Sequence, residues 1–165
     1  MQQENEILIK SLGVKDMETK LISNEQDLKK AFAIREQVFV NEQEVAIEDE
    51  FDEFDVIGST CQHILVFYDG QAVGTGRIRF LEQTGKLERI CILEPYRKLG
   101  IGKIIIGSLE EIAESQGAAQ VKLHGQTQAA GFYKKLGYES RSAVFMEDGI
   151  PHIVMTKDLS HGKRI

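Results

Sequence analysis

The sequence predicts a single mixed α/β domain in which helices flank a central mixed sheet. Its 165 residues suit one domain of ordinary size. A hydrophobic fraction of 42% and a charged fraction of 28% are typical of a globular protein. A strand, a helix and a strand follow one another beyond the middle of the chain, and this order implies a right-handed crossover between parallel strands.

The N-terminal part is predicted to hold a short strand and a helix. Residues 1–18 show no steady period, so we expect an extension that forms an appended strand or a loose tail. Residues 20–22 are predicted to be the first strand of a domain that spans residues 19–159. Ser23 and Gln26 have the spacing of a capping box, which places the start of a helix there. The apolar residues of this helix form one stripe: Leu28, Ala31, Phe32, Val38 and Phe39.

Arg35 lies on the same apolar stripe. An isolated charge in a protein core is very unfavourable, so the guanidinium must be paired or face a cavity. The sequence leaves two alternatives open, a structural ion pair and a ligand-facing role.

Three strands are predicted in the middle of the chain. Residues 63–68 and 72–80 are apolar runs joined by a tight Asp-Gly turn, which indicates a hairpin. Gly74 and Gly76 inside the second run suggest a bulge or a close backbone approach. Residues 86–93 follow as a third strand.

The C-terminal part is predicted to alternate helices and strands before a final hairpin. Helical periodicity begins near Gly100, and Gly117 closes that helix. Residues 160–165 are expected to be a tail. The remaining elements are a strand at 120–124, a helix at 127–136, and a hairpin of 138–145 with 152–157.

Composition predicts a cytoplasmic protein that binds neither nucleic acid nor membrane. A net charge of −6 argues against a nucleic-acid binder. The longest apolar runs are far shorter than the roughly 20 residues of a membrane-spanning helix, and residues 1–6 lack the features of a secretory signal. Cys61 and Cys91 are expected to be reduced thiols, and without a His cluster they predict no metal site. The oligomeric state stays open, a homodimer included.

A glycine-spaced segment between a strand and a helix carries the clearest functional signal. Residues 97–102 read Arg-Lys-Leu-Gly-Ile-Gly. Glycines let the backbone approach a phosphate, and the N–H groups and dipole of a helix start favour an anion. Arg97, Lys98 and Lys103 add positive charge. The segment lacks the Gly-Lys-Ser/Thr of a P-loop and the longer glycine fingerprint of dinucleotide folds, so it predicts a pyrophosphate site of another kind.

Together with residues 132–138, this segment resembles the acetyl-CoA motif and the last helix of the GCN5-related N-acetyltransferases. The resemblance covers residues 20–157. Residues 34–43 also resemble a bacterial subgroup that includes ElaA and YjcF. The resemblance implies a sheet with a splayed pair of parallel strands, acetyl-CoA as co-substrate, and acetyl transfer to an amine that attacks the thioester directly.

The resemblance also implies a set of cofactor-binding residues. The amides of Cys91 and Ile92 would bind the thioester carbonyl and the pantetheine arm, and residues 100–103 would hold the pyrophosphate. Gln126 stands where many relatives have Asn, so that contact is either remade or lost. The implied set is Ile90, Cys91, Ile92, Arg97, Lys98, Leu99, Gly100, Ile101, Gly102, Lys103, Gln126 and Phe132.

Three residues are candidates for proton transfer. Tyr133 would lie near the sulfur and protonate the leaving thiolate, unless it is an aromatic packing residue. Attack requires a neutral amine, and Glu88 and His124 are the candidate bases. Glu88 comes first because it is expected on the same strand face as Ile90 and Ile92; its alternative is an ion pair with a neighbouring Arg. His124 could equally be a hydrogen-bonded core residue.

The acceptor side is predicted from an acidic stretch that follows the first helix, between Glu42 and Asp55. Its carboxylates would attract a small cationic amine or a lysine-like acceptor. Arg35, Phe39 and Glu42 are the candidate substrate-binding residues. Cys91 is expected to pack in the core and not to act as a nucleophile. A domain that binds acetyl-CoA as a sensor or interaction module, without catalysis, is the alternative function.

Overall fold

In the computed structural model the structure describes residues 16–159. Its first half contains β1 (Met17–Leu21), α2 (Glu25–Arg35), η1 (Glu36–Glu42), α3 (Ile47–Glu50), β2 (Gln62–Tyr68) and β3 (Gln71–Leu81). Its second half contains β4 (Thr84–Ile92), η2 (Glu94–Tyr96), α4 (Ile101–Ser115), β5 (Gln120–Gln126), η3 (Thr127–Ala129), α5 (Ala130–Lys135), β6 (Glu139–Ser140), β7 (Phe145–Glu147) and β8 (Ile150–Asp158). The predicted tail and most of the predicted extension lie outside the described residues.

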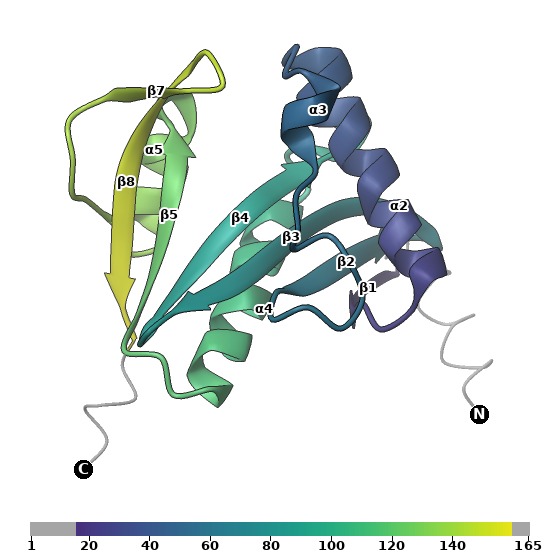
Figure 1. Ribbon diagram of the computed structural model, residues 1–165, viewed down its shortest axis with the longest axis horizontal. Helices are drawn as coiled ribbons and strands as arrows, with labels where there is room; N and C mark the ends of the chain where they lie inside the picture. The colour runs from purple at the N-terminus through teal and green to yellow at the C-terminus, as the bar shows by residue number, and fades with distance from the viewer. Residues whose placement is uncertain (1–15, 160–165) are drawn as a thin grey trace.

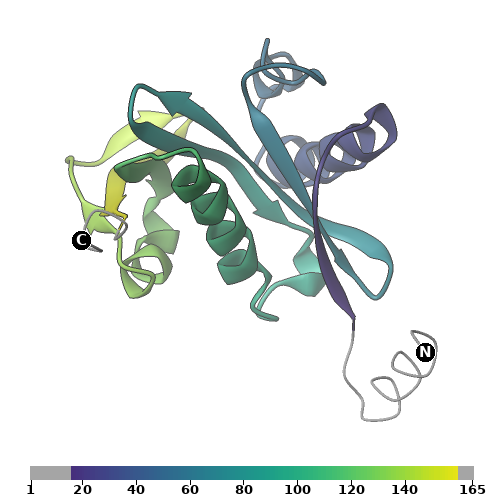
Figure 2. The ribbon, with the colours of Figure 1, turned by 90° about the horizontal axis from the view of Figure 1, so that it is seen from below.

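One mixed sheet forms the centre of the fold, as predicted. Its strands follow the order β1-β2-β3-β4-β5-β8-β6, and β7 also pairs with β8. Among the described strands, β4 and β5 pair in parallel and the other neighbours pair antiparallel. Helices α2 and α3 lie over one face of the sheet, and α4 covers the other (Figure 1; Figure 2). We call these the α2 face and the α4 face.

The parallel pair opens into a V. Strands β4 and β5 pair only from Thr84 with Gln120 to Leu87 with Leu123. Beyond this register the two strands diverge, which is visible near the centre of Figure 1. The divergence leaves one edge of the second half of β4 without a partner strand, and the predicted splay is confirmed.

An extra residue in β4 marks the point where the strands separate. On β3, Arg77 pairs with Glu88 and Thr75 pairs with Cys91, so three steps along β4 oppose two along β3. Arg89 has a φ of 56° at this place. This is a β-bulge, and it changes which face of the sheet each following side chain occupies.

Two apolar clusters hold the helices to the sheet. The larger joins α4 to the α4 face, and the smaller joins α2 to the α2 face. The glycines of β3 permit the first contact: a Cβ on Gly76 would come within 2.9 Å of Ile105 Cγ2, and one on Gly74 within 3.1 Å of Ile105 Cδ1. The predicted close backbone approach at these glycines is confirmed.

The predicted start of α2 is wrong by one residue. Asn24, not Ser23, is the N-cap, and its side-chain oxygen accepts a hydrogen bond from the Asp27 amide at 2.8 Å. Ser and Asn cap helices about equally well, so adjacent candidates cannot be separated by type. After Arg35 the chain continues as the π-helix η1, in which Gln43 N donates to Val38 O.

The C-terminal predictions need two corrections. The helix predicted at 127–136 starts with the 3-10 turn η3, and its α-helical part is the short α5. The strand predicted at 138–145 is broken into β6 and β7. Arg141 N and Ser142 Oγ still bond the backbone of Val154, so this segment follows β8 without a continuous ladder.

Candidate active site

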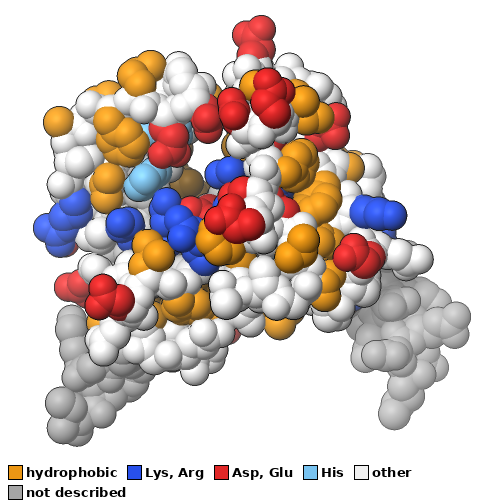
Figure 3. Space-filling view, viewed as in Figure 1, with side chains coloured by type: hydrophobic (Ala, Val, Ile, Leu, Met, Phe, Trp, Pro, Cys, Tyr) orange, Lys and Arg blue, Asp and Glu red, His pale blue; other side chains and the backbone are white. Residues whose placement is uncertain are grey.

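An open cavity of about 740 Å³ lies between the splayed ends of β4 and β5. From the α4 face it is lined by the loop before α4 and by α5, and from the α2 face by residues of η1 and the acidic stretch. Figure 3 views the α2 face, where a notch separates two lobes, with Lys and Arg side chains in its depth and Asp and Glu on its walls. Of the predicted cofactor residues, all except Leu99 line this cavity, and Leu99 is exposed.

The start of α4 presents backbone donors to the cavity. Gly100 is the N-cap with a φ of 83°, a conformation that glycine adopts without strain, and no side chain caps this helix. The first N–H groups of a helix have no partner within the helix. Because Lys98 and Lys103 line the cavity at the same place, the site suits an anion.

Arg97 is held by the protein itself. Its Nη atoms donate to the Glu42 carboxylate at 2.8 and 3.1 Å, and its Nε donates to Ile92 O at 2.9 Å. The guanidinium thus joins the end of η1 to the end of β4. Glu42, predicted to bind substrate, pairs with Arg97 and does not line the cavity.

The unpaired edge of β4 presents the Ile92 amide to the V. Leu93 N donates to Val73 O of β3 at 2.9 Å, and Cys91 is in register with Thr75 of β3. Backbone groups of alternate residues point the same way along a strand, so the Cys91 amide also faces β3. The Ile92 amide therefore faces the open side. Of the two amides predicted to serve the cofactor, the strand geometry therefore favours that of Ile92.

Two aromatic residues of α5 line the cavity, and each packs against a glycine. A Cβ on Gly102 would lie 3.1 Å from Phe132 Cζ, and one on Gly125 would lie 3.1 Å from Tyr133 Cδ2. The rings of Phe132 and Tyr133 are in edge contact, with centroids 5.2 Å apart. These contacts hold the Tyr133 ring against β5, where it lines the cavity.

The Tyr133 hydroxyl stays protonated at neutral pH. Burial raises the pKa of Tyr133 to about 12. The side chain lines the cavity, and within residues 16–159 no group hydrogen-bonds its hydroxyl. A protonated, uncommitted hydroxyl in this position is a proton donor available to a bound molecule.

Glu88 is not placed as predicted. The bulge at Arg89 puts it on the α2 face, beside Arg77, whereas Ile90 packs toward the α4 face near Gly76. Its carboxylate is bound by Arg77, Arg79 and Lys86 at 2.9 to 3.1 Å. Burial alone would raise the pKa of Glu88, but the hydrogen bond from Lys86 and the nearby guanidinium groups outweigh it and hold the pKa below its usual value. A carboxylate stabilised in this way is a weak base.

His124 has the geometry of a base. Its Nδ1 lies 2.8 Å from Glu147 Oε1. A carboxylate only accepts, so Nδ1 carries the hydrogen, and the neutral ring keeps a lone pair on Nε2. The ring also makes an edge contact with Phe145 and lines the cavity. Glu147 was missed by the sequence analysis because it lies in the turn of the final hairpin, where no pattern pointed to it.

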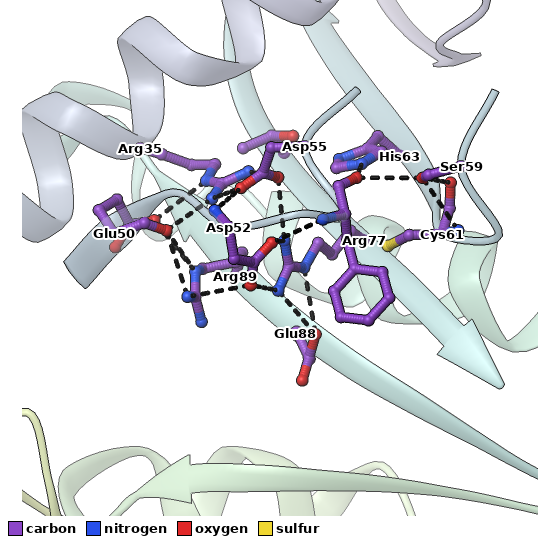
Figure 4. Close-up of polar contacts among 12 residues, drawn as sticks. Arg35, Glu50, Asp52, Asp55, Ser59, Cys61, His63, Arg77, Glu88 and Arg89 are labelled. Atoms are coloured by element: carbon purple, nitrogen blue, oxygen red, sulfur yellow. Dashed lines mark hydrogen bonds and ion pairs between the residues drawn. The ribbon is translucent and has the colours of Figure 1, made fainter. Parts of the chain in front are cut away.

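Arg35 belongs to a buried charge network and not to the cavity lining (Figure 4). Its side chain is 1% exposed and donates to Glu50 and to both oxygens of Asp55. Of the two alternatives for Arg35, the structure fits the ion pair. Phe39 is thus the one predicted acceptor residue that lines the cavity.

Two glutamines connect the end of β5 to the end of η1. Gln126 Nε2 at the end of β5 donates to Gln43 Oε1 at the end of η1, at 3.0 Å. Both residues line the cavity. Gln43 was not among the predicted site residues, because its position opposite Gln126 depends on the unusual geometry of the π-helix.

Cys91 is a packing residue. It is buried in the smaller apolar cluster, and burial raises the pKa of its thiol far above the usual range. Across the described part of the chain, no group of three or more His, Cys, Asp or Glu side chains is arranged to hold a metal ion. None of the helices between residues 16 and 159 is long and apolar enough to cross a membrane.

Known proteins resemble this chain over most of its length. A family model described as an acetyltransferase (GNAT) domain matches residues 24–159. YyaT of Bacillus subtilis (strain 168) is 60% identical over 144 residues, which covers 87% of this chain and 97% of that protein. The N-acetyltransferase YjcF of the same strain is 46% identical over 143 residues, covering 86% of this chain and 100% of YjcF.

Solved structures share the fold. An acyl-CoA N-acyltransferase from Pseudomonas aeruginosa superposes with a TM-score of 0.75 at 26% identity, covering 87% of this chain and 99% of that one. Escherichia coli ElaA superposes with a TM-score of 0.77 at 24% identity, covering 87% of this chain and 100% of ElaA. These matches agree with the subgroup that residues 34–43 predict.

Proposed function

The chain belongs to the GNAT family of acetyltransferases, and from this premise we propose that it moves an acetyl group from acetyl-CoA to a primary amine by direct attack in a ternary complex. One observation carries the proposal. The uncapped start of α4, the free Ile92 amide and the Tyr133 hydroxyl line one cavity, which is open to both faces of the sheet.

The α4 side of the cavity suits the coenzyme. The amides of residues 100–103 would hold the pyrophosphate, with Lys98 and Lys103 supplying charge. The pantetheine arm would then run along the unpaired edge of β4, where the Ile92 amide can donate to the thioester oxygen. Negative charge develops on that oxygen during attack, so a fixed N–H lowers the barrier.

Proton transfers complete the reaction. The amine nitrogen attacks the thioester carbonyl carbon, a C–N bond forms, and the C–S bond breaks. Tyr133 donates its proton to the leaving thiolate, and the proton lost by the amine passes to His124 directly or through water. His124 replaces Glu88 as the preferred base, because three cations pair with the ionised Glu88 carboxylate and make it a weak base.

We still propose an amine acceptor, but the acidic stretch no longer supports electrostatic attraction of that amine. In the acidic stretch, Glu50, Asp52 and Asp55 are paired with Arg35, Arg77 and Arg89. These carboxylates therefore contribute little attraction for a cationic or lysine-like acceptor. Asp49 remains as a cavity-lining carboxylate of this stretch.

Acetyl-CoA binding and thiol release against a panel of amines test the proposal. We expect acetyl-CoA to raise the Tm, and at least one primary amine to cause release of CoA thiol. Tyr133→Phe should keep the Tm shift and lose turnover by about 10²-fold or more, since it removes the acid but not the cradle. A Tm shift without thiol release for any amine would instead favour the non-catalytic sensor module.

A further inference from the structure

We propose that the acceptor is a primary amine that also carries a carboxylate, and that Arg79, Lys86 and Arg89 bind this carboxylate. The inference deepens the proposed function and rests on it. It names an amino-acid class of acceptor in place of a purely cationic amine.

The three cations lie together on the α2 face of the cavity. Arg79 is on β3, while Lys86 and Arg89 are on β4, and all three line the cavity. Their side chains are 16 to 24% exposed, so they are half-buried yet reachable. The depth of the notch in Figure 3 is correspondingly lined with Lys and Arg.

The charge network to which these three cations belong carries more positive than negative groups. Five cations (Arg35, Arg77, Arg79, Lys86 and Arg89) share four carboxylates (Glu50, Asp52, Asp55 and Glu88). The most buried members, Arg35 and Arg77, use the greater part of the hydrogen-bonding capacity of these carboxylates. The surplus positive charge is therefore left to the less buried cations Arg79, Lys86 and Arg89.

Two of the cavity-lining arginines keep guanidinium nitrogens without a hydrogen-bond partner among the described residues. Arg79 donates through Nε to Glu88, and in the described residues its two terminal nitrogens have no hydrogen-bond partner. Arg89 uses Nε and Nη2 on Glu50 and leaves Nη1 without one. Open guanidinium nitrogens at half-buried positions favour a carboxylate, which they bind with charge-assisted hydrogen bonds.

A fourth cation extends the basic surface onto β5. Lys122 is in register with Lys86 across the parallel pair, so both side chains occupy the same face. Among residues 16–159 no carboxylate forms an ion pair with Lys122. The apex of the V is therefore basic on both arms.

The walls of the notch have the opposite sign. Asp49 of α3 lines one wall and Asp148, in the turn between β7 and β8, lines the other. A carboxylate-bearing amine fits this arrangement better than a plain anion does, because its ammonium group is attracted at the entrance while its carboxylate is attracted at the floor.

The spacing along β4 suits a small acceptor molecule. Arg89 and Ile92 are three residues apart, which is about 10 Å along a strand. An amine beside the thioester at Ile92 and a carboxylate at the Arg89 guanidinium can therefore belong to one amino-acid-sized molecule. The anion site at the start of α4 faces the other side of the sheet and stays free for the coenzyme.

Matched pairs of acceptors test this assignment. Thiol release is measured with free amino acids and with their carboxamides, which keep the amine and the shape but lose the charge. We expect kcat/KM to be at least about tenfold higher for the carboxylate, the size of one charge-assisted hydrogen bond. Lys86→Gln and Arg79→Gln should shrink this ratio through KM, with the KM for acetyl-CoA unchanged.

Controls separate the outcomes. Lys30→Gln, on the outer side of α2, should keep the wild-type ratio, and the Tm shift with acetyl-CoA shows that each variant folds. Equal kcat/KM for both members of every pair overturns the inference while amine acetylation stands. Absence of turnover with every amine overturns the proposed function. The carboxylate site is then tested by the Tm of the CoA complex. A Tm raised by amino acids but not by their carboxamides supports the inference, and equal effects overturn it.

Discussion

At the scale of single residues, the site depends on which polar atoms the fold leaves free. The sequence placed Glu88 ahead of His124 as the candidate base, and hydrogen-bond partners reverse this order. Three cations occupy the Glu88 carboxylate, whereas Glu147 holds one nitrogen of His124 and leaves the other to the cavity. Partners from distant strands cannot be read from residue spacing, so this choice required the structure.

The pair of His124 and Glu147 gives a prediction for pH dependence. His124→Gln should lower kcat/KM by about 10²-fold and remove the acidic limb of its pH profile, because the base is lost. Glu147→Gln should cause a smaller loss, since it releases the ring orientation but keeps the imidazole.

The pH profile of kcat/KM for Glu88→Gln shows which of the two residues is the base. Measured at saturating acetyl-CoA, this profile should keep an acidic limb like that of the wild type. If Glu88→Gln abolishes the limb and His124→Gln does not, the roles assigned to the two residues are reversed.

At the scale of elements, contacts between α5 and β5 place Tyr133. A methyl group at position 125 would meet Tyr133 Cδ2 at 3.1 Å and Leu123 Cδ1 at 3.2 Å. Gly125→Ala should therefore push the Tyr133 ring out of the V, lower stability by about 1 to 3 kcal/mol and reduce kcat more than acetyl-CoA affinity.

Urea unfolding and steady-state kinetics measure the two effects. Gly107→Ala is a matched control, because Gly107 lies inside α4 and a Cβ there meets nothing within 4 Å. That variant should keep kcat and gain up to about 1 kcal/mol, since alanine favours a helix. A Gly125→Ala enzyme with unchanged kcat would show that Tyr133 does not depend on this contact.

Elements with a strong period were predicted well, and those set by tertiary contacts were not. Helix α4 and strands β2 to β5 follow their apolar patterns, and the loop at 97–102 lies where the glycines placed it. The bulge at Arg89 has no sequence signature, because an arginine with positive φ looks like any strand residue. That single extra residue reversed the expected face of Glu88.

At the scale of the whole molecule, a network of buried charges ties three separate segments together. Arg35 comes from α2, Arg77 from β3, and both bind Asp55 from the acidic stretch. The stretch that was predicted to attract the acceptor is therefore an internal partner for two buried guanidinium groups. It fixes α2 and the α3 segment on the sheet, and so shapes the α2 face of the cavity.

Acid should weaken this network in a defined direction. Burial raises the pKa of Asp55, yet the hydrogen bond and charge of Arg35 outweigh it, so the folded-state pKa lies below the usual 3.8; Glu88 likewise lies below 4.5. A carboxylate with a depressed pKa stabilises the fold above its unfolded-state pKa, and this stability is lost as pH falls through the folded-state value. Glu50, whose pKa is raised by burial, opposes this trend in part.

We therefore expect the free energy of unfolding to fall as the pH drops below about 4.5, the usual value for Glu. Asp55→Asn should lose about 3 kcal/mol at pH 7, because two buried guanidinium groups lose a charged partner, and this difference should shrink at low pH. Urea titrations from pH 7 to pH 3 measure the free energy of unfolding of the wild type and its difference from that of Asp55→Asn. Asp158→Asn, at an exposed position of β8, is the matched control and should follow the wild type. A constant difference between Asp55→Asn and wild type across this range would mean that the Asp55 charge does not hold α2 on the sheet.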